Sequence, residues 1–222
     1  MGTKQRSQTN GECPLRHLQA TGNHAKKKSR VATERNEAKR LEFHEKIVQI
    51  DPEYLVFLDE AGFNLAMYFA YGWSIAGQRL IEPVPFGRGK NYSVLGAFDL
   101  LGMVTTLQKE GSIKRVDVEA FLEKDLLPRL EAGAVLVLDN ARSHHGGRLE
   151  EIAESFGCSI LYLPPYSPDF NPIELAWSWI KTFVRRVCPR DVDARLAAIG
   201  LAIASVPAAF GESWFRKSGL QC

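Results

Sequence analysis

Three short apolar runs along the chain predict buried strands, because each is β-prone, continuous and followed by turn or loop residues. The runs are Leu55–Leu58, the apolar part of Ala134–Asn140, and Ile160–Leu163, which Pro164 stops. A helical segment separates the second run from the third, and helical crossovers of this kind join parallel strands. The pattern therefore predicts an α/β fold whose sheet is parallel in part.

Two antiparallel strands are expected between the first and second runs. The Trp73–Pro85 region and Tyr92–Gln108 are interpreted as these strands. Within the second region, Ser93–Phe98 and Met103–Leu107 carry the stronger β signal, with Gly102 between them as a turn or bulge.

Apolar residues three or four positions apart predict the helices. The helix after Ile160–Leu163 has the clearest start, since Asn171 is a good N-cap and Pro172 suits the first helical position. Glu174 then falls at the third helical position. The other expected helices are Thr33–Ile50 with Thr33 as a cap, Val118–Leu130 starting at Asp117 or the residue before it, Arg148–Phe156, and Val192–Val206, with Trp214 and Phe215 packing the tail onto the core.

Acidic residues follow two of the apolar runs. Asp59 comes directly after the first run and Asp139 after the second, so both are expected at one edge of the sheet. Glu174 on a nearby helix has a common structural interpretation, a capping-box glutamate that reaches back to the amide of Asn171. Capping alone does not explain three carboxylates converging on one place, and this convergence predicts a metal site.

Converging carboxylates repel one another unless a cation neutralises them, and hard oxygen ligands select Mg²⁺ or Mn²⁺. Two such ions can activate a nucleophile and stabilise the leaving oxygen in a phosphoryl displacement. Asp59 would contact both ions, while Asp139 and Glu174 would each complete one site. The nucleophile would be water for strand cleavage and a DNA 3′-hydroxyl for strand joining.

Other polar and aromatic residues are weaker candidates for the site. Glu60 follows Asp59 but points to the opposite face of the strand, which favours a structural role. Asp169 lies in a loop, where a turn role is favoured. Trp177 and Trp179 are interpreted as helix packing in preference to base stacking.

Length and charge limit the possible organisation. The 222 residues fit one domain of roughly 150–200 residues plus an extension. Residues 1–25 show no periodicity and are expected to be disordered, residues 26–52 form a basic linker and helix, and residues 53–222 form the domain that carries the carboxylates. With 28 Lys and Arg against 26 Asp and Glu, the whole chain is not a polybasic binder.

Basic residues are nevertheless clustered near the N-terminus and after the Glu174 helix. Such blocks are usually solvated faces, but beside carboxylates they could hold a phosphate backbone. The loop Gly87–Lys90 lacks the spacing of a P-loop, and a plain hairpin turn explains it equally well. The candidate DNA contacts are Lys26, Lys27, Lys28, Arg88, Lys90, His144, Arg185 and Arg186.

The cysteines and apolar runs indicate the compartment. The four cysteines form no C-x-x-C pair, which argues against a disulfide framework or zinc ribbon and fits a reducing cytoplasm. No apolar run approaches the roughly 18–20 residues of a membrane span, and no signal peptide is recognisable, so no membrane partner is expected.

Three sequence blocks together resemble a known family. LVFLDEAGFN, LVLDNARSHH and LPPYSPDFNPIELAWSWIK are similar to the catalytic blocks of bacterial insertion-sequence transposases of the mariner-like superfamily, which belong to the DDE class. The resemblance implies a ribonuclease H-like mixed five-stranded sheet flanked by helices. It also implies that Asp59, Asp139 and Glu174 are the metal-binding triad, and that the spacing of the last two is that of this branch.

The same resemblance implies partners and a location. Family members cut double-stranded DNA at terminal inverted repeats and insert the element into target DNA, commonly at a TA dinucleotide. A homodimer in the DNA complex and a bacterial cytoplasmic location, with the nucleoid when bound, are expected. Residues 1–25 do not resemble the usual helix-turn-helix domains, so either a separately encoded DNA-binding protein supplies them or the copy is truncated.

Two alternatives remain open at this point. One is another ribonuclease H-like nuclease that acts on structured or hybrid nucleic acid. The other is a catalytically silent remnant that binds DNA or full-length transposase.

Overall fold

A mixed five-stranded sheet lies at the centre of the fold, with the strand order β3-β2-β1-β4-β5. The computed structural model describes residues 32–83, 89–140 and 148–220, and Glu34–Cys222 forms one compact unit. β1 runs antiparallel to β2 and parallel to β4, and β4 runs parallel to β5. The expected part-parallel sheet is confirmed. The strands are β1 (Leu55–Phe63), β2 (Tyr92–Asp99), β3 (Gly102–Glu110), β4 (Val135–Leu138) and β5 (Ser159–Tyr162).

The first strand is longer than its apolar run predicted. β1 continues past Asp59 to Phe63, so the prediction that Asp59 marks the end of a strand is wrong. The reason is unequal pairing on its two sides. β4 accompanies β1 only as far as Leu58, whereas β2 pairs with it through to Phe63.

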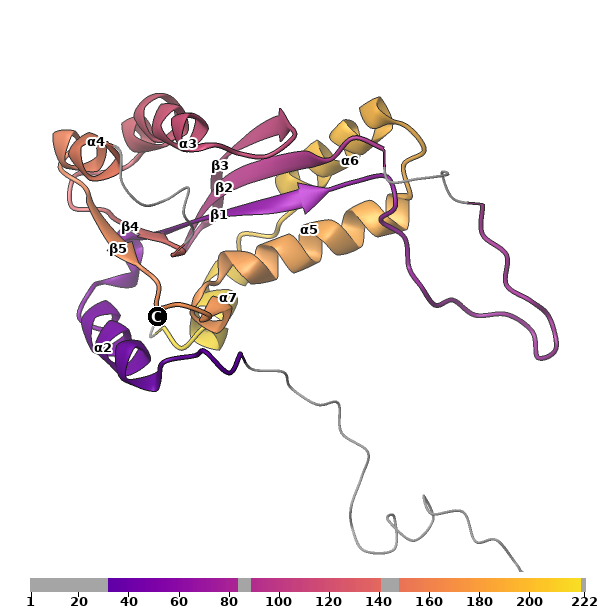
Figure 1. Ribbon diagram of the computed structural model, residues 1–222, viewed down its shortest axis with the longest axis horizontal. Helices are drawn as coiled ribbons and strands as arrows, with labels where there is room; N and C mark the ends of the chain where they lie inside the picture. The colour runs from indigo at the N-terminus through magenta and orange to yellow at the C-terminus, as the bar shows by residue number, and fades with distance from the viewer. Residues whose placement is uncertain (1–31, 84–88, 141–147, 221–222) are drawn as a thin grey trace, which may run out of the picture. The chain divides into compact units, whose positions relative to one another are not determined.

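The strand expected at Trp73–Pro85 does not form in the part of that region that the structure describes. Both edges of β1 are already paired, by β2 and β4, so this segment cannot pair with the strand that it follows. Residues 64–83 instead follow an irregular path beyond the end of β1 (Figure 1). From Tyr68 onward their large apolar side chains are exposed, and Trp73 is fully so.

Helices cover both faces of the sheet and create two separate cores. In Figure 1, α3 and α4 lie on one side of the sheet and α5 on the other. One core joins α3 and α4 to the sheet, and the other joins α2, α5, α6 and α7 to it. Phe215 of α7 is buried against Phe57 of β1, which confirms the expected packing of the tail. The helices are α2 (Glu37–Ile47), α3 (Arg115–Phe121), α4 (Leu149–Ser155), α5 (Ile173–Val187), α6 (Val192–Ala204) and α7 (Phe210–Lys217).

Several helix starts differ from the sequence prediction. α2 is capped by Asn36, whose Oδ1 accepts a hydrogen bond from the amide of Lys39, and not by Thr33. α3 begins at Arg115, because the Asp117 carboxylate bonds the amide of Lys114 from the third helical position. The helix expected to reach Leu130 continues as a π-helical turn, Leu122–Leu126, and a final 3₁₀ turn, Leu127–Arg129. No helix in the described ranges is long and apolar enough to cross a membrane.

Candidate active site

The three carboxylates predicted from the sequence line one pocket of about 480 Å³. Asp59 comes from β1, Asp139 follows β4 directly, and Glu174 lies in the first turn of α5. The rest of the wall comes from Asn140, the segment Leu163–Pro168 and Asn171. The fold thus brings together residues that are far apart in the sequence.

The register of two parallel strands places the aspartates side by side. Leu58 of β1 and Leu138 of β4 form the last pair of the parallel ladder, and the next residue in each strand is an aspartate. Neighbouring strands lie only about 4.8 Å apart. The two aspartates therefore meet at the point where β4 ends.

Glu174 reaches the pocket through an abrupt start of α5. A 3₁₀ turn, Pro168–Phe170, precedes the helix, and Pro172 occupies the cap position without a side-chain cap. The prediction of Asn171 as the N-cap is therefore wrong by one residue. The capping-box interpretation of Glu174 fails as well, because the amide of Asn171 already donates to the carbonyl of Pro168 at 3.0 Å.

The surroundings of Glu174 favour its protonated form. Burial raises the pKa of Glu174, the positive charge of Lys181 lowers it, and the negative charge of Asp139 raises it again, so that the pKa lies above the ordinary value. The contribution of Asp139 is the expected effect of a like charge nearby. A cation bound between these carboxylates would remove that repulsion.

Asp59 is 8% exposed, and a tryptophan holds its carboxylate. The indole Nε1 of Trp177 donates a hydrogen bond to Asp59 Oδ2 at 3.1 Å. Trp177 is buried, as predicted for helix packing, but the prediction missed this polar contact. The signal was present in the sequence, because Trp177 follows Glu174 by three positions and so faces the same side of α5.

The sequence interpretation also missed Asn171 as a residue of the pocket wall. Its side chain is 3% exposed and lines the pocket beside the carboxylates. The side-chain oxygen Oδ1 is buried and has no hydrogen-bond partner. Such an unsatisfied acceptor is costly in a folded protein, and sites that take a ligand are one place where it is found.

The carboxylate and amide oxygens that line the pocket suit a divalent cation, although the described residues do not form a preformed metal site. Within the described ranges, no group of three or more His, Cys, Asp or Glu side chains is arranged to hold a metal ion. Carboxylate and amide oxygens are the ligands that Mg²⁺ and Mn²⁺ prefer, and Mg²⁺ typically keeps several waters and uses few protein ligands. The residues therefore fit the ion by chemistry.

Asp169 does more than the turn role predicted for it. Its carboxylate accepts two hydrogen bonds from the guanidinium of Arg40 on α2, at 2.6 and 3.0 Å. The guanidinium also lies 4.0 Å from the centre of the Phe170 ring. Burial raises the pKa of Asp169, but the Arg40 pair outweighs it and holds the pKa below the ordinary value. These contacts fix α2 to the loop that forms the pocket wall.

Glu60 and the described candidate DNA contacts, Lys90, Arg185 and Arg186, do not line the carboxylate pocket. Glu60 is exposed and does not line the pocket, as its place in the strand predicted. The Lys90 ammonium pairs with Glu110 at 2.8 Å, and Arg185 and Arg186 lie in the last turn of α5. The remaining candidates, Lys26, Lys27, Lys28, Arg88 and His144, lie outside the described residues.

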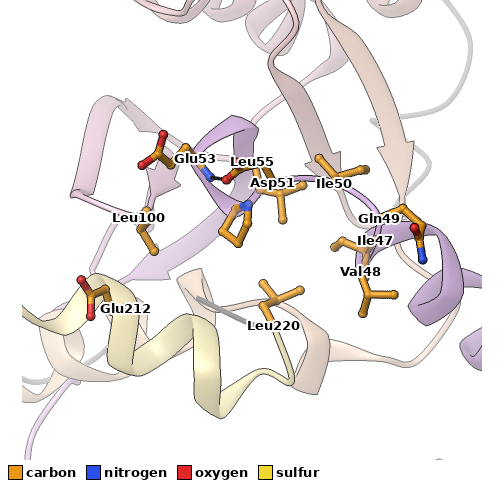
Figure 2. A pocket seen from close by; sticks show the side chains of 11 residues that line it. Ile47, Val48, Gln49, Ile50, Asp51, Glu53, Leu55, Leu100, Glu212 and Leu220 are labelled. Carbon is orange, nitrogen blue, oxygen red and sulfur yellow. Dashed lines mark hydrogen bonds between the residues drawn. The ribbon is translucent and has the colours of Figure 1, made fainter.

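A larger pocket, of about 570 Å³, lies between the end of α2 and α7 (Figure 2). Apolar side chains such as Ile47, Leu100 and Leu220 form much of its wall, with Glu53 and Glu212 among them. Its third acid, Asp51, caps the short 3₁₀ helix Pro52–Tyr54 by accepting from the amide of Glu53. None of the converging carboxylates lies there, so chemistry and not size identifies the site.

Comparisons with known proteins identify the family of this chain. The profile of the family described as DDE superfamily endonuclease matches residues 54–194. The Tcb1 transposase of a transposable element of Caenorhabditis briggsae is 23% identical over 223 residues, which cover 93% of this chain and 81% of that protein.

Solved structures of the Mos1 transposase share the fold. The Mos1 mariner paired end complex with Mn superposes with a TM-score of 0.70 at 18% identity, covering 92% of this chain and 65% of that chain. The Mos1 catalytic domain with Raltegravir and Mg gives a TM-score of 0.57 at 15% identity and covers 91% of that chain. The expected ribonuclease H-like sheet is confirmed. With a family match over more than half its length, this chain belongs to the DDE superfamily endonucleases.

Proposed function

We propose that residues 53–222 form the catalytic domain of a metal-dependent DNA transposase that cleaves DNA at transposon ends and joins them to target DNA. One observation carries the proposal: Asp59, Asp139 and Glu174 line a single pocket in a chain of the DDE superfamily. Their three oxygen-donating side chains come from β1, β4 and α5, elements whose relative positions are fixed by the sheet and its cores.

These three residues would hold two divalent cations, Mg²⁺ or Mn²⁺. Bound ions of this kind polarise the scissile phosphate and activate a water or a DNA 3′-hydroxyl. Complexes of the Mos1 neighbours contain Mg or Mn, which supports the choice of metal. Glu174 must lose its proton before it can act as a ligand, and its raised pKa makes this step dependent on pH.

Double-stranded DNA is the proposed partner. The Mos1 neighbours include a paired end complex and a strand transfer complex, which supports binding to transposon ends and to target DNA. The basic residues named from the sequence stay predictions as DNA contacts. A separately encoded DNA-binding partner and a bacterial insertion-sequence origin also stay predictions.

A homodimer in the DNA complex is part of the proposal. The exposed segment after β1 supports it, because Tyr71, Trp73 and Ile81 all present most of their apolar surface to solvent. Patches of this kind commonly mark protein interaction sites. Sedimentation of the chain with and without duplex DNA tests this part by itself.

The catalytically silent alternative would share the carboxylate pocket and the family match. The two readings differ in whether added Mn²⁺ produces DNA cleavage that depends on the triad.

Cleavage of matched substrates tests the proposal. The purified chain is incubated with Mn²⁺ and either a supercoiled plasmid or an RNA–DNA hybrid, with Asp139→Asn run in parallel. We expect nicking of the plasmid by the wild type and none by the variant. Preference for the hybrid would favour another ribonuclease H-like nuclease, and the absence of cleavage would favour the silent remnant. Equal nicking by both proteins would show that Asp139 is not needed.

A further inference from the structure

We infer that Trp177 is a positioning residue that fixes the rotation of the Asp59 carboxylate, and that Gly96 exists to make room for it. The inference rests on the proposed function, because it concerns how Asp59 is presented to a divalent cation. Its basis is two contacts that together link β2, β1 and α5.

The first contact is the hydrogen bond between the Trp177 indole and Asp59. Trp177 is 1% exposed and Asp59 is largely buried, so little water competes for either group. A hydrogen bond from a neutral donor to a charged acceptor is stronger than one between neutral groups. With Oδ2 held at 3.1 Å by Nε1, the carboxylate is no longer free to rotate about its bond to the strand.

The second contact explains how so large a ring reaches the strand. Gly96 of β2 lies directly opposite Asp59 of β1 in the antiparallel ladder. A Cβ at Gly96 would come within 2.7 and 2.9 Å of two carbons of the Trp177 ring. Real Cβ contacts do not come so close, so any side chain at this position must displace the ring. The glycine therefore clears the space that the indole occupies beside Asp59.

The role of this arrangement is to orient a ligand before the metal arrives. Groups that hydrogen-bond a metal-ligating carboxylate set its orientation, and their loss typically lowers metal affinity or activity about 10–100-fold. Trp177 donates a hydrogen bond without adding negative charge. It can thus hold Asp59 in place without increasing the repulsion among the three carboxylates.

The test combines a spectroscopic signal with a binding measurement. The indole N–H signals of the four tryptophans are recorded by NMR, and Trp177→Phe identifies the one that belongs to Trp177. Asp59→Asn should shift that signal more than the other three. Mn²⁺ binding in the absence of DNA should weaken about tenfold or more in Trp177→Phe. Trp179→Phe, a partly buried tryptophan of the same helix that stacks on Phe183, is the matched control and should bind as the wild type.

Gly96→Ala provides a second variant that removes no hydrogen-bonding group. By displacing the ring it should also weaken Mn²⁺ binding. If the Trp177 signal does not respond to Asp59→Asn, or if folded Trp177→Phe binds Mn²⁺ with wild-type affinity, the positioning role is refuted. A wild type that binds no Mn²⁺ would instead refute the proposed function, while the response of the indole signal would still decide whether the hydrogen bond exists.

A different observation supports a second inference, a phosphate-binding subsite for nucleic acid on α2. A small pocket of about 210 Å³ shares Asn140 and Leu163–Pro165 with the carboxylate pocket. Lys39 and Lys46 of α2 line its other side. We propose that these lysines hold one backbone phosphate of a bound nucleic acid strand. The neighbouring phosphate of the same nucleic acid strand would lie at the carboxylates.

Charge and rigidity both support the subsite. Three carboxylates repel a nucleic acid strand, so cations at the adjoining pocket would offset that repulsion. The bidentate Arg40–Asp169 pair and the stacking of Phe43 on Phe170 fix α2 against the pocket wall. Lys46 forms a 2.7 Å ion pair with Glu42, which a phosphate would have to share or displace.

The salt dependence of DNA binding tests this subsite without relying on catalysis. Each lost phosphate contact should reduce the slope of log K against log salt by about 0.9 for duplex DNA. We expect a reduction in Lys39→Gln and in Lys46→Gln, tighter binding in Glu42→Gln, and no change in Lys124→Gln, an exposed lysine on the other side of the sheet. Wild-type slopes in Lys39→Gln and Lys46→Gln would refute the subsite alone. A wild type without salt-dependent DNA binding would refute the subsite and the proposed function together.

Discussion

The two faces of the central sheet bury different kinds of side chain. The face covered by α3 and α4 packs an apolar core that includes Leu122, Leu126 and Leu136. The face covered by α5 and α6 buries Asp59 and the guanidinium of Arg195 among its apolar residues. The Arg195 guanidinium has three nitrogens without hydrogen-bond partners, lies 4.7 Å from the Tyr92 ring centre, and has a pKa lowered by burial. Both faces hold an apolar core, but the face covered by α5 and α6 also buries charged groups.

Neighbouring residues show how sharply the strand separates the faces. Asp59 and Glu60 differ by one position, yet only Asp59 faces α5 and lines the pocket. Alternation along a strand sends successive side chains to opposite faces. The side of the pleated strand on which a carboxylate lies therefore decides whether it can line the pocket.

The largest expected effect on stability comes from the apolar face. Leu122→Ala should lower the free energy of unfolding by about 2–5 kcal/mol, because the fully buried side chain leaves a cavity. Urea denaturation measures the change. DNA nicking per folded molecule should stay at the wild-type level. A selective loss of nicking would contradict the view that this face of the sheet takes no part in the carboxylate site.

A smaller effect is expected where α2 meets the pocket wall. Asp169→Asn removes the pair with Arg40 and should cost about 1 kcal/mol or less, since the Asp169 carboxylate is half exposed. The pair lowers the pKa of Asp169, so its contribution is present above the ordinary pKa and is lost as pH falls through the lower folded value. Unfolding of both proteins across acidic pH should show the difference shrinking towards low pH. A difference that grows there would contradict the assigned cause.

The smallest expected effect is a gain in stability. Without metal, Glu174→Gln should stabilise the fold by only a fraction of about 1 kcal/mol at neutral pH, because it removes a negative charge near Asp139 and solvent screens this exposed side chain. The folded pKa of Glu174 is raised, so wild-type stability falls as pH rises from the ordinary pKa through the folded value. Thermal unfolding with a chelator should show a flatter pH profile for the variant. Added Mn²⁺ should stabilise the wild type more than the variant, and equal stabilisation would argue against Glu174 as a ligand.

Local patterns in the sequence predicted the sheet and the carboxylates well. The apolar runs before Asp59 and Asp139 identified two strands. The structure shows that they are adjacent and parallel, in a register that brings the two side chains together. The helix carrying Glu174 was also recognised, although its cap was placed one residue early. These features depend on short-range alternation and on turn residues, which a sequence displays directly.

Features that depend on distant partners were not predictable in the same way. The segment Trp73–Pro85 has β-prone residues, but whether a strand forms depends on a free sheet edge, and β1 offers none. The extension of β1 to Phe63 likewise depends on pairing with β2. The helical spacing of Glu174 and Trp177 places both on one side of α5, but no local pattern shows that Gly96, on a third element, makes room for the Trp177 ring beside Asp59.

A matched pair of glutamate variants tests the central claim most directly. Glu174→Gln and Glu60→Gln each remove one negative charge, but only the first alters the carboxylate pocket. In a Mn²⁺-dependent plasmid nicking assay at equal concentrations of folded protein, we expect Glu174→Gln to lose nicking by at least the roughly 10–100-fold that is typical when a residue supporting a metal ligand is changed. Glu60→Gln should nick at the wild-type rate. Wild-type nicking by Glu174→Gln, or an equal loss in both variants, would contradict the assignment of the site.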